Sequence, residues 1–357
     1  MFKKIVLVTG LWHPEVGGPV LYAQNLANYL AQKNFDVRIV NPGRYGKTLP
    51  SPVRFVVYFF KVLKNSFGRS AIYALDPWLC GISSFLVSRL LRTKYLMRLG
   101  GDTIWERWVF TSRQPLSLRE FYKQGLHRQS KKFAVIKKVM QNAAKIIAPN
   151  QLLKDLYVEY YRVPEEKVEI IANPIPAPLP PKTTTVNDQI IYAGRLINLK
   201  NLDFIIRLFP EVKKQRPNLK FIIIGEGEEK TKLLNLVGDL GLEKEIIFLG
   251  KMPQNQLFEQ ISQSKVGVLA SFSDCNPNFI LECLSLKKPV LITKENGLTV
   301  TLDEKFLFDH RDAKEFMDKL NYLLTNYDAT RKEIRQLDLS WSWDRWLEKN
   351  YQLITSL

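Results

Sequence analysis

The feature that most constrains the fold of this chain is an alternation of short apolar runs with helical segments, which occurs twice. In the first half, Lys3–Val8 and Phe35–Val40 are rich in β-branched residues, and Leu21–Gln32 between them has its apolar residues at helical spacing. Strands that alternate with helices form a parallel sheet covered by helices. Three more strands are expected in this half, at Ala71–Leu75, Tyr95–Leu99 and Lys145–Ala148.

The same alternation restarts after a proline-dense segment, Asn173–Pro181, which cannot continue a helix or a central strand. We therefore predict an α/β protein of two Rossmann-like, doubly wound domains, residues 1–173 and 174–340, followed by an aromatic-rich helix at Trp341–Ile354. Two such domains facing each other leave a cleft at the carboxyl ends of both sheets, where ligands bind. In the second half, strands are expected at Gln189–Ala193, Lys220–Ile224, Glu245–Leu249, Val266–Ala270 and Pro289–Thr293, and helices at Leu202–Lys214, Glu228–Leu240, Gln254–Ser262 and Phe279–Leu286.

Composition agrees with two globular domains. A chain of 357 residues is long enough for two hydrophobic cores. Its three cysteines, Cys80, Cys275 and Cys283, have neither metal-ligand spacing nor an even count, which is typical of a reducing cytosol. The N-terminal apolar run is too short for a signal peptide, and Trp78–Leu91 is interrupted by serines and an arginine, so neither predicts a membrane span. We expect a cytoplasmic protein.

The net charge of +17 is concentrated in the first half. Residues 1–173 hold 27 Lys and Arg against 11 Asp and Glu, whereas residues 174–357 hold 25 against 24. Such an asymmetry indicates contact with an anionic surface, and charge alone allows either nucleic acid or a membrane. Lys61–Arg69 and Arg119–Lys138 interleave cations with aromatic side chains, which favours an anionic membrane; the alternative is a solvated helix face packed on the domain's own core. No motif typical of nucleic-acid binding occurs, so we expect no nucleic-acid partner.

A first candidate motif follows the first strand of the second half. That strand ends in Gly194 and Arg195, and Lys200 lies five residues further on, just before a helix. Fixed cations beside a helix N-terminus form a good cradle for a diphosphate. The alternative is a solvated turn with two ordinary surface cations, and this motif by itself does not choose between them.

A second candidate motif, residues 273–282 with the sequence SDCNPNFILE, follows the fourth strand of the second half. A helix is expected to begin near Asn278 or Phe279, with the free amides of its first turn facing the cleft. Glu282 is expected on that first turn, where the helix dipole favours a carboxylate, and Asp274 lies in the loop before it. This spacing suits opposite ends of a small polar ligand rather than an acid/base pair that shares a proton. The alternative is a capping carboxylate plus a loop aspartate.

Paired glycines, Gly17 and Gly18, follow the first strand of the chain and allow its backbone to approach an anion closely. No Gly-Lys-Ser or Gly-Lys-Thr follows them, so they do not form a P-loop. Gly225 and Gly227 do not begin a dinucleotide fingerprint either. The third glycine is replaced by Lys230, and two glutamates would repel a pyrophosphate.

In their order and spacing these motifs resemble the family 4 retaining glycosyltransferases, which have the GT-B fold. The resemblance covers nearly the whole chain and is best from 189 to 298. It implies two Rossmann-like domains facing a central cleft, with the acceptor bound by the first domain, the nucleotide sugar by the second, and helix 341–357 packed back on the first. The motifs that carry it are Gly17-Gly18, Gly194-Arg195 with Lys200-Asn201, Gly225-Glu-Gly227, Phe248-Leu-Gly250, and Asp274-x7-Glu282 followed by Lys288-Pro289-Val290.

The resemblance also assigns roles to individual residues. It implies that Arg195 and Lys200 bind the donor diphosphate and neutralise the charge that develops on the leaving nucleotide. It implies that Asp274 contacts hydroxyls of the transferred sugar and that Glu282 accepts the ribose hydroxyls of the nucleotide. The other donor contacts that it implies are Gly17, Gly18, Lys251, Met252, Asn276, Asn278, Phe279 and Ile280.

Two departures from the family's pattern affect these roles. The first acid is Asp274 rather than glutamate, and Asn276-Pro-Asn278-Phe279 stands where the family usually has Gly-Phe-Gly, so we expect the two asparagines to help choose the sugar. The family often has a histidine near the acceptor, after the fourth strand; Asp102 lies there in this chain. Asp102 is a candidate to orient the acceptor hydroxyl or accept its proton, and a helix N-cap is the alternative.

The histidines offer neither a catalytic triad nor a metal site. His13 follows the first strand and is placed to line the cleft, whereas His127 and His310 are expected on the surface. No Asp-x-Asp occurs anywhere in the chain, which argues against a metal-bound nucleotide sugar. Arg195, Lys200 and helix amides would neutralise the diphosphate instead, so we expect no metal and no cofactor.

The function that this resemblance implies is that of a metal-independent, retaining hexosyltransferase, which moves a sugar from a UDP- or GDP-sugar to a hydroxyl acceptor. The expected acceptor is a lipid-linked sugar or glycan at the inner face of the membrane, in cell-surface polysaccharide or glycolipid synthesis. Two alternatives stay open. One is a nucleotide-sugar epimerase, because the fold alone does not prove transfer; the other is a basic module that binds nucleic acid.

Overall fold

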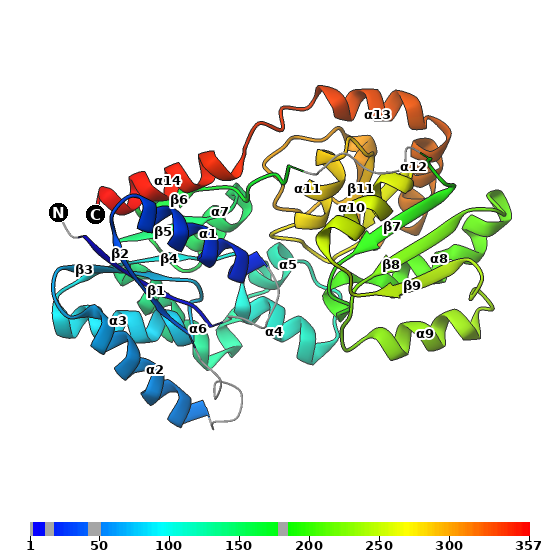
Figure 1. The fold of residues 1–357 in the computed structure, drawn as a ribbon. Helices are drawn as coiled ribbons and strands as arrows, with labels where there is room; N and C mark the ends of the chain where they lie inside the picture. Colours follow the sequence, from blue (N-terminus) through cyan, green and yellow to red (C-terminus); the bar gives the residue numbers. More distant parts are fainter. Residues whose placement is uncertain (1–2, 11–17, 42–50, 178–184) are drawn as a thin grey trace. The chain divides into compact units, whose positions relative to one another are not determined.

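The computed structural model describes residues 3–10, 18–41, 51–177 and 185–357. The chain divides into two compact units (Figure 1). The first consists of Met1–Ile104, Gly125–Ala172 and Trp343–Leu357, and the second of Trp105–Gln124 and Asn173–Ser342. Residues 105–124, which we expected in the first domain, therefore group with the second unit. No helix within the described part of the chain is long and apolar enough to cross a membrane.

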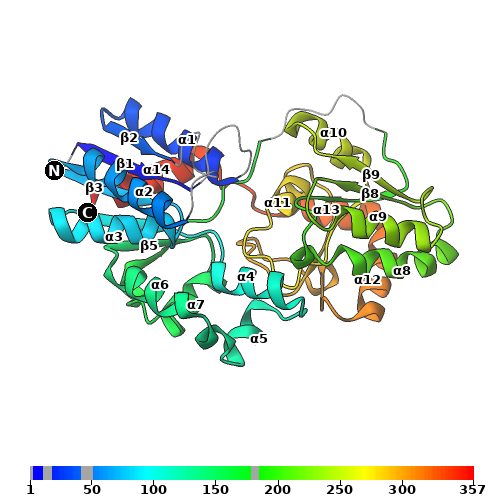
Figure 2. The same cartoon turned by 90° about the horizontal axis from the view of Figure 1, so that it is seen from below.

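The first unit is built on a six-stranded parallel sheet with the order β2-β1-β3-β4-β5-β6. Helices α1 and α14 lie on one face of this sheet, and α2, α3 and α6 lie on the other (Figures 1 and 2). The strands are β1 Lys4–Val8, β2 Asp36–Val40, β3 Ser70–Ala74, β4 Lys94–Arg98, β5 Lys145–Ala148 and β6 Val168–Ile170. The helices are α1 Gly18–Gln32, α2 Ser51–Ser66, α3 Leu79–Leu91, α6 Lys131–Asn142, α7 Gln151–Glu159 and α14 Trp343–Thr355.

The second unit is also built on a six-stranded parallel sheet, with the order β12-β11-β10-β7-β8-β9. The strands are β7 Gln189–Ala193, β8 Lys220–Ile224, β9 Ile246–Gly250, β10 Val266–Leu269, β11 Val290–Thr293 and β12 Leu307–Phe308. The helices are α5 Leu118–Lys123, α8 Leu202–Gln215, α9 Lys230–Asp239, α10 Gln254–Gln263, α11 Asn278–Ser285, α12 Ala313–Thr325 and α13 Tyr327–Gln336, and α4 Thr103–Ser112 begins just before the inserted residues 105–124. The predicted fold class, two doubly wound α/β domains, is confirmed.

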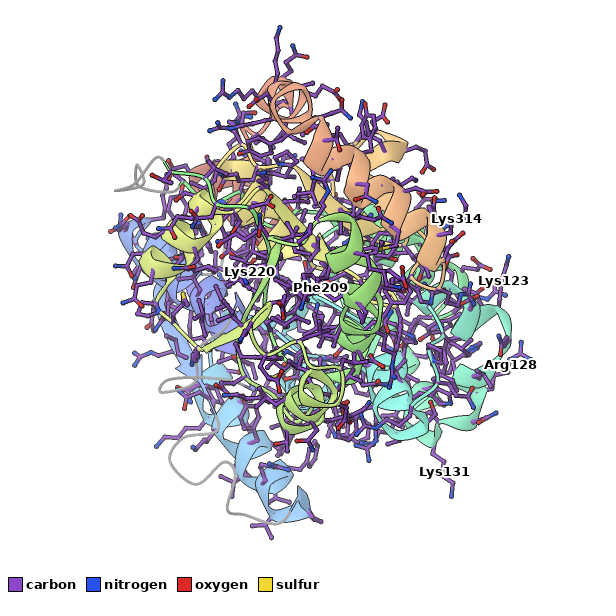
Figure 3. The ribbon with its side chains drawn as sticks, turned by 90° about the vertical axis from the view of Figure 1, so that its right-hand side faces the viewer. Lys123, Arg128, Lys131, Phe209, Lys220 and Lys314 are labelled. Atoms are coloured by element: carbon purple, nitrogen blue, oxygen red, sulfur yellow. The ribbon has the colours of Figure 1, made fainter. Side chains whose placement is uncertain are left out.

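Hydrophobic periodicity explains the core of the second unit. Helix α8 buries Leu202, Ile205, Ile206, Phe209 and Val212, which recur at helical spacing, against the sheet. The side chain of Phe209 points into the unit, as Figure 3 shows. Full burial of each such side chain contributes about 1.5–3 kcal/mol. The short edge strands β6 and β12 were not expected from the sequence, because three and two residues are too few to show an alternation.

The C-terminal helix α14 packs on α1 within the first unit. The ring of Tyr22 lies 5.4 Å from each of the rings of Trp343 and Trp346. The guanidinium carbon of Arg98 lies 4.3 Å from the Tyr22 ring centroid, and the Tyr73 hydroxyl donates to Asn350 Oδ1 at 2.8 Å. The same guanidinium carbon lies 5.5 Å from the Trp346 ring centroid, and this cation–π contact and the buried hydrogen bond tie α14 to β4 and β3, strands far from it in sequence.

Candidate functional site

In the second unit, the two candidate motifs lie side by side because of the strand order. Strand β7 pairs in parallel with β10, although the chain passes through β8 and β9 between them. The strand order therefore reverses at this point, and the loops at the carboxyl ends of β7 and β10 are neighbours. In open α/β sheets, ligands bind at such a switch point.

Two glycines allow the loop after β8 to pack on the loop after β7. A Cβ added to Gly225 would lie 1.8 Å from the carbonyl oxygen of Gly194, and one added to Gly227 would lie 2.2 Å from that of Leu196. Both positions therefore require glycine. The Leu196 N–H donates to the Glu226 carbonyl at 2.9 Å, which closes the contact. These glycines serve close backbone packing beside Arg195.

Lys200 and Asp274 form an ion pair at the switch point. Both side chains are largely buried, with 16% and 6% of their surfaces exposed. Asp274 Oδ2 also accepts from Ser271 Oγ at 3.2 Å, and Asp274 Oδ1 accepts from the Asn276 N–H at 3.1 Å. The structure thus brings together a predicted phosphate-binding cation and a predicted sugar-binding carboxylate that lie 74 residues apart.

Arg195 is exposed at the end of β7, and its guanidinium has no carboxylate partner among the residues that the structure describes. The turn that carries it is held by the Tyr192 hydroxyl, which donates to the Arg195 carbonyl at 2.9 Å. The charge of Arg195 is therefore available to an anion without first breaking an ion pair.

The loop before α11 is held by a cluster of three asparagines. Asn173 Nδ2 donates to Asn276 Oδ1 at 2.5 Å and to Asn278 Oδ1 at 2.8 Å. The Asn278 N–H donates to the Asn276 carbonyl at 2.7 Å, so it does not face a ligand as we expected. Asn173, at the N-terminal edge of the unit, was missed by the sequence analysis because it lies 103 residues from its partner Asn276.

The side chains of Phe279 and Ile280 belong to the hydrophobic core. Ile280 is fully buried, and the Phe279 ring lies 5.9 Å from the Tyr192 ring. Burial excludes the Ile280 side chain from a donor, so the predicted donor contact of Ile280 can come only from its backbone. The backbone N–H groups of both residues have no acceptor among the described residues, so the first turn of α11 keeps two open donors.

Glu282 lies in the second turn of α11, not in the first turn as we expected, because the helix begins at Asn278. The helix dipole therefore stabilises its carboxylate less than predicted. Burial raises the pKa of Glu282 to about 7, and a hydrogen bond from Gln254 Nε2 at 3.3 Å opposes the rise. Sequence reasoning missed Gln254; its position two residues after Met252, a predicted donor contact, was the available signal.

Lys251 and Met252 follow β9 at the edge of the sheet. Lys251 is exposed, whereas Met252 is half-buried and packs against the core. They immediately precede α10, which carries Gln254, the partner of Glu282. The hydrogen bond between Gln254 and Glu282 therefore places Glu282 close to the N-terminus of α10, which Lys251 and Met252 precede.

Of the site residues predicted in the first half, the described ones, Gly18 and Asp102, lie in the first unit. Gly18 begins helix α1, and Gly17 and His13 lie outside the described residues. Asp102 is buried and accepts from the Tyr161 hydroxyl at 2.6 Å. The phenol holds Asp102 in place, so its carboxylate already has one structural partner.

A carboxylate that the sequence analysis did not weigh, Asp76, lies at the switch point of the first sheet. It follows β3, which pairs with β1, and a Cβ added to Gly10 would lie 3.0 Å from Asp76 Oδ2. Burial raises the pKa of Asp76, although N–H groups of Trp78 and Cys80 donate to it. The available signal was an acid directly after a predicted strand.

The predicted surface positions of His127 and His310 are wrong, because both side chains are 5% exposed. The His127 ring lies between aromatic rings, 4.7 Å from Phe133 and 5.5 Å from Tyr160. Burial lowers the pKa of His127. His310 Nε2 lies 3.2 Å from the Pro115 carbonyl oxygen, which can only accept, so this nitrogen carries the proton.

Most of the second unit matches a known sequence-family model. Residues 181–337 match the family model described as Glycosyl transferases group 1. An uncharacterised glycosyltransferase of Methanocaldococcus jannaschii is 29% identical over 211 residues, which are 56% of this chain and 50% of that protein.

A second relative and one solved structure extend the comparison. The N-acetylgalactosamine-N,N'-diacetylbacillosaminyl-diphospho-undecaprenol 4-alpha-N-acetylgalactosaminyltransferase of Campylobacter jejuni is 28% identical over 208 residues, 53% of this chain and 55% of that protein. The chain therefore spans about half the length of these two relatives. The structure of HepE from Anabaena in complex with UDP-glucose has a TM-score of 0.74 at 16% identity, covering 99% of this chain and 100% of that one. These matches show the GT-B fold and support a glycosyltransferase.

Proposed function

We propose that this protein is a retaining glycosyltransferase of the family 4 type, which transfers a sugar from a nucleotide-diphosphate donor to a hydroxyl acceptor without a metal ion. The observation that carries the proposal is the pairing of Lys200 with Asp274 beside Arg195, at the switch point of a domain that matches the group 1 family model. Cations suited to a diphosphate and a carboxylate suited to sugar hydroxyls lie together there.

The ion pair defines what each residue does when a donor binds. The diphosphate attracts Lys200, and Arg195 supplies a second charge that no carboxylate of the described ranges neutralises. As Lys200 turns to the phosphates, an oxygen of Asp274 becomes an acceptor for hydroxyls of the sugar. The open N–H groups of Phe279 and Ile280 add hydrogen bonds to the anion. As the bond to the sugar breaks, negative charge develops on the leaving phosphate, which these fixed donors stabilise.

A thermal-shift panel tests the proposal. The purified protein is heated with UDP, GDP and their hexose derivatives, with and without EDTA, because a bound donor raises Tm by mass action. We expect one nucleotide class to raise Tm and EDTA to leave the shift unchanged. The stabilising donor is then incubated with the protein, and the sugar product is identified. Conversion of the donor to its epimer would favour the epimerase alternative, and no shift with any nucleotide would remove the proposed function.

The pKa of Glu282 predicts how donor affinity depends on pH. If its carboxylate accepts ribose hydroxyls, the deprotonated form binds, and with a pKa of about 7 the donor should bind about tenfold more tightly at pH 8 than at pH 6. A UDP-sugar is the right probe, because its diphosphate carries no group that titrates in this range. The dissociation constant is measured by calorimetry, with Glu282→Gln as the control that removes the dependence. Equal affinity of the wild type at both pH values would contradict the ribose role.

The raised pKa of Glu282 also predicts how the stability of the protein depends on pH. Because the folded-state pKa of Glu282 lies above the unfolded value of about 4.5, folding favours the protonated form. The stabilisation relative to the charged form is complete below pH 4.5 and is lost as pH rises through 7. Glu282→Gln should therefore be more stable than the wild type at pH 8, which denaturant unfolding measures.

Helix α2 supports an anionic membrane surface as a partner of the first unit. Its inner face buries Tyr58 and Val62, yet its outer face exposes four large apolar side chains by 39% to 60%. The helix carries three cations and no acid. The exposed side chains are Val53, Val56, Val57 and Phe60, at helical spacing. An exposed apolar stripe beside cations suits the boundary between lipid headgroups and acyl chains.

The second basic segment, Arg119–Lys138, does not form the aromatic surface that we expected. Its aromatic and apolar members Phe121, Tyr122 and Ile136 are at most 2% exposed and belong to the core. The side chains of Arg128 and Lys131 do point outward, as Figure 3 shows. These cations add charge but no apolar contact, so α2 is the part of the first unit that suits a membrane best.

Sedimentation with vesicles tests the membrane partner. The wild type should pellet with vesicles that contain anionic phospholipid and remain in solution with neutral ones. The variant Val56→Ser/Phe60→Ser should bind the anionic vesicles about tenfold less, because two apolar side chains no longer enter the interface. The matched control is Leu234→Ser, which replaces an exposed leucine on α9 of the second unit. Equal partition of the wild type onto both kinds of vesicle would remove this partner.

A further inference from the structure

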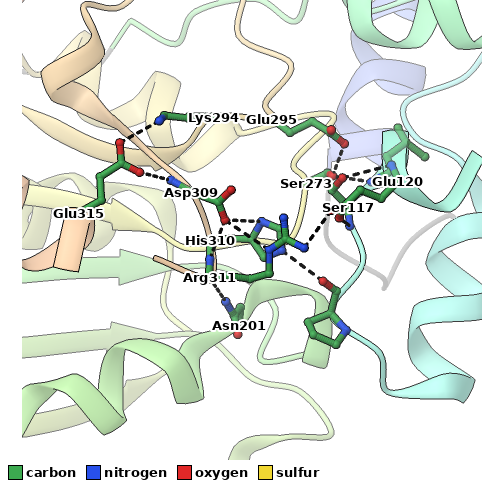
Figure 4. A network of polar contacts seen from close by, with 12 residues as sticks. Ser117, Glu120, Asn201, Ser273, Lys294, Glu295, Asp309, His310, Arg311 and Glu315 are labelled. Atoms are coloured by element: carbon green, nitrogen blue, oxygen red, sulfur yellow. Dashed lines mark hydrogen bonds and ion pairs between the residues drawn. The ribbon is translucent and has the colours of Figure 1, made fainter. Parts of the chain in front are cut away.

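The inserted segment, Trp105–Gln124, belongs to the second unit although it lies in the first half of the chain. Its short helix α5 begins against two loops of that unit (Figure 4). The Leu118 N–H donates to Ser273 Oγ at 2.7 Å, and the Arg119 N–H donates to Glu295 Oε1 at 3.0 Å. Ser117 Oγ accepts the third N–H of the helix, from Glu120. All first-turn donors of α5 are thereby satisfied, two of them by partners more than 150 residues away.

Glu295 connects this helix to the loop that carries Asp274. Its Oε1 accepts from Ser273 Oγ at 2.5 Å as well as from the Arg119 N–H. Its backbone carbonyl accepts from the Asp274 N–H at 3.1 Å, and the Asp274 carbonyl accepts from the Gly297 N–H at 2.7 Å. Glu295 therefore binds the side chain of Ser273, the residue before Asp274, and the backbone of Asp274 itself.

The inserted segment also reaches the loop that carries Lys200. The Pro115 carbonyl accepts from His310 Nε2 at 3.2 Å, and the His310 carbonyl accepts from Asn201 Nδ2 at 3.1 Å. Asn201 directly follows Lys200. The guanidinium of Arg311, the residue after His310, forms an ion pair with Glu120 of α5 at 2.8 Å (Figure 4). This ion pair is a second link between the turn at residues 310–311 and the inserted segment.

A third contact leads to Arg195. Arg113 of the inserted segment forms an ion pair with Glu229, whose side chain is 8% exposed. The Glu229 N–H donates to the Leu196 carbonyl at 3.0 Å, and Leu196 directly follows Arg195. The two loops that carry Arg195, Lys200 and Asp274 are thus fixed to the inserted segment at three places, directly or through one residue.

We propose that Glu295 is a positioning residue for the donor, which holds Asp274 in place by fixing Ser273 and α5 of the inserted segment. Without its carboxylate, the Arg119 N–H and the Ser273 hydroxyl lose their acceptor. The loop can then shift, and a shift of about 1 Å at a binding group can lower turnover by about 10²-fold. The effect on turnover rests on the proposed function; the effect on the order of the loop does not.

Three variants test the positioning role. Glu295→Ala should lower kcat/KM for the donor by about 10- to 100-fold. Glu295→Gln should stay within about threefold of the wild type, because its amide oxygen accepts both hydrogen bonds. The matched control is Glu245→Ala, which removes a buried carboxylate paired with Lys213 at 2.8 Å at the opposite end of the second sheet. Turnover is measured well below the Tm of every variant.

Hydrogen exchange supplies a readout that needs no donor. Amides of residues 115–121 and 272–278 should exchange faster in Glu295→Ala than in the wild type, and should be unchanged in Glu245→Ala. Unchanged exchange in Glu295→Ala would overturn the inference, as would an equal loss of turnover in both alanine variants, which would indicate lost stability alone. A wild type that binds no nucleotide sugar would instead remove the proposed function, and the exchange result would still decide the inference.

Discussion

Replacing Arg195 by alanine should lower kcat for sugar transfer by about 10²- to 10³-fold while Tm stays unchanged. The rate falls because a fixed charge that stabilises the leaving diphosphate is lost, and removal of one such donor typically costs about 3–4 kcal/mol of transition-state stabilisation. Stability is retained because Arg195 is exposed and makes no ion pair with any residue that the structure describes. The Arg195→Ala variant therefore tests the effect on turnover without a change in stability.

The measurement is the initial rate at saturating donor, together with thermal unfolding of the same preparation. The matched control is Arg207→Ala, which removes an exposed arginine from α8 of the same unit and should leave both quantities unchanged. Wild-type kcat in Arg195→Ala would show that this cation does not act on the leaving group. A lower Tm would instead indicate a structural role.

Removing one partner of the Lys200–Asp274 pair should affect both stability and turnover. Lys200→Met leaves the Asp274 carboxylate largely buried without its cation and should destabilise the protein by about 3 kcal/mol. Asp274→Asn should cost less, because the long side chain of Lys200 can reach water. The double variant should regain about 2 kcal/mol relative to the sum of the single changes, because neither charge is left unpaired. Transfer should be lost in all three.

Denaturant unfolding of the four proteins measures this coupling, and transfer assays of the same samples measure turnover. Recovery of stability without recovery of turnover would separate the structural and the functional roles of the pair. Additive stability losses would show that the two groups do not interact in solution. Turnover in the double variant would exclude both residues from the proposed donor site.

Much of the fold follows from local pattern. The helical spacing of Leu202, Ile205 and Phe209 was sufficient to predict α8, and the β-branched run at Gln189–Ala193 was sufficient to predict β7. These patterns predict secondary structure because the buried face of a helix or strand carries apolar residues at the period of that element. The expected bounds of these helices and strands differ from the observed bounds by three residues or fewer.

The sequence by itself determined the type and order of the elements and the chemistry at the ends of β7 and β10. Only the tertiary structure decided which of these groups meet. Periodicity shows which face of an element is buried, but not which distant loop lies beside it. The pairing of Lys200 with Asp274, the transfer of residues 105–124 to the second unit and the links through Glu295 all join residues far apart in the chain. Such contacts are set by strand order and loop packing, which leave no local signal in the sequence.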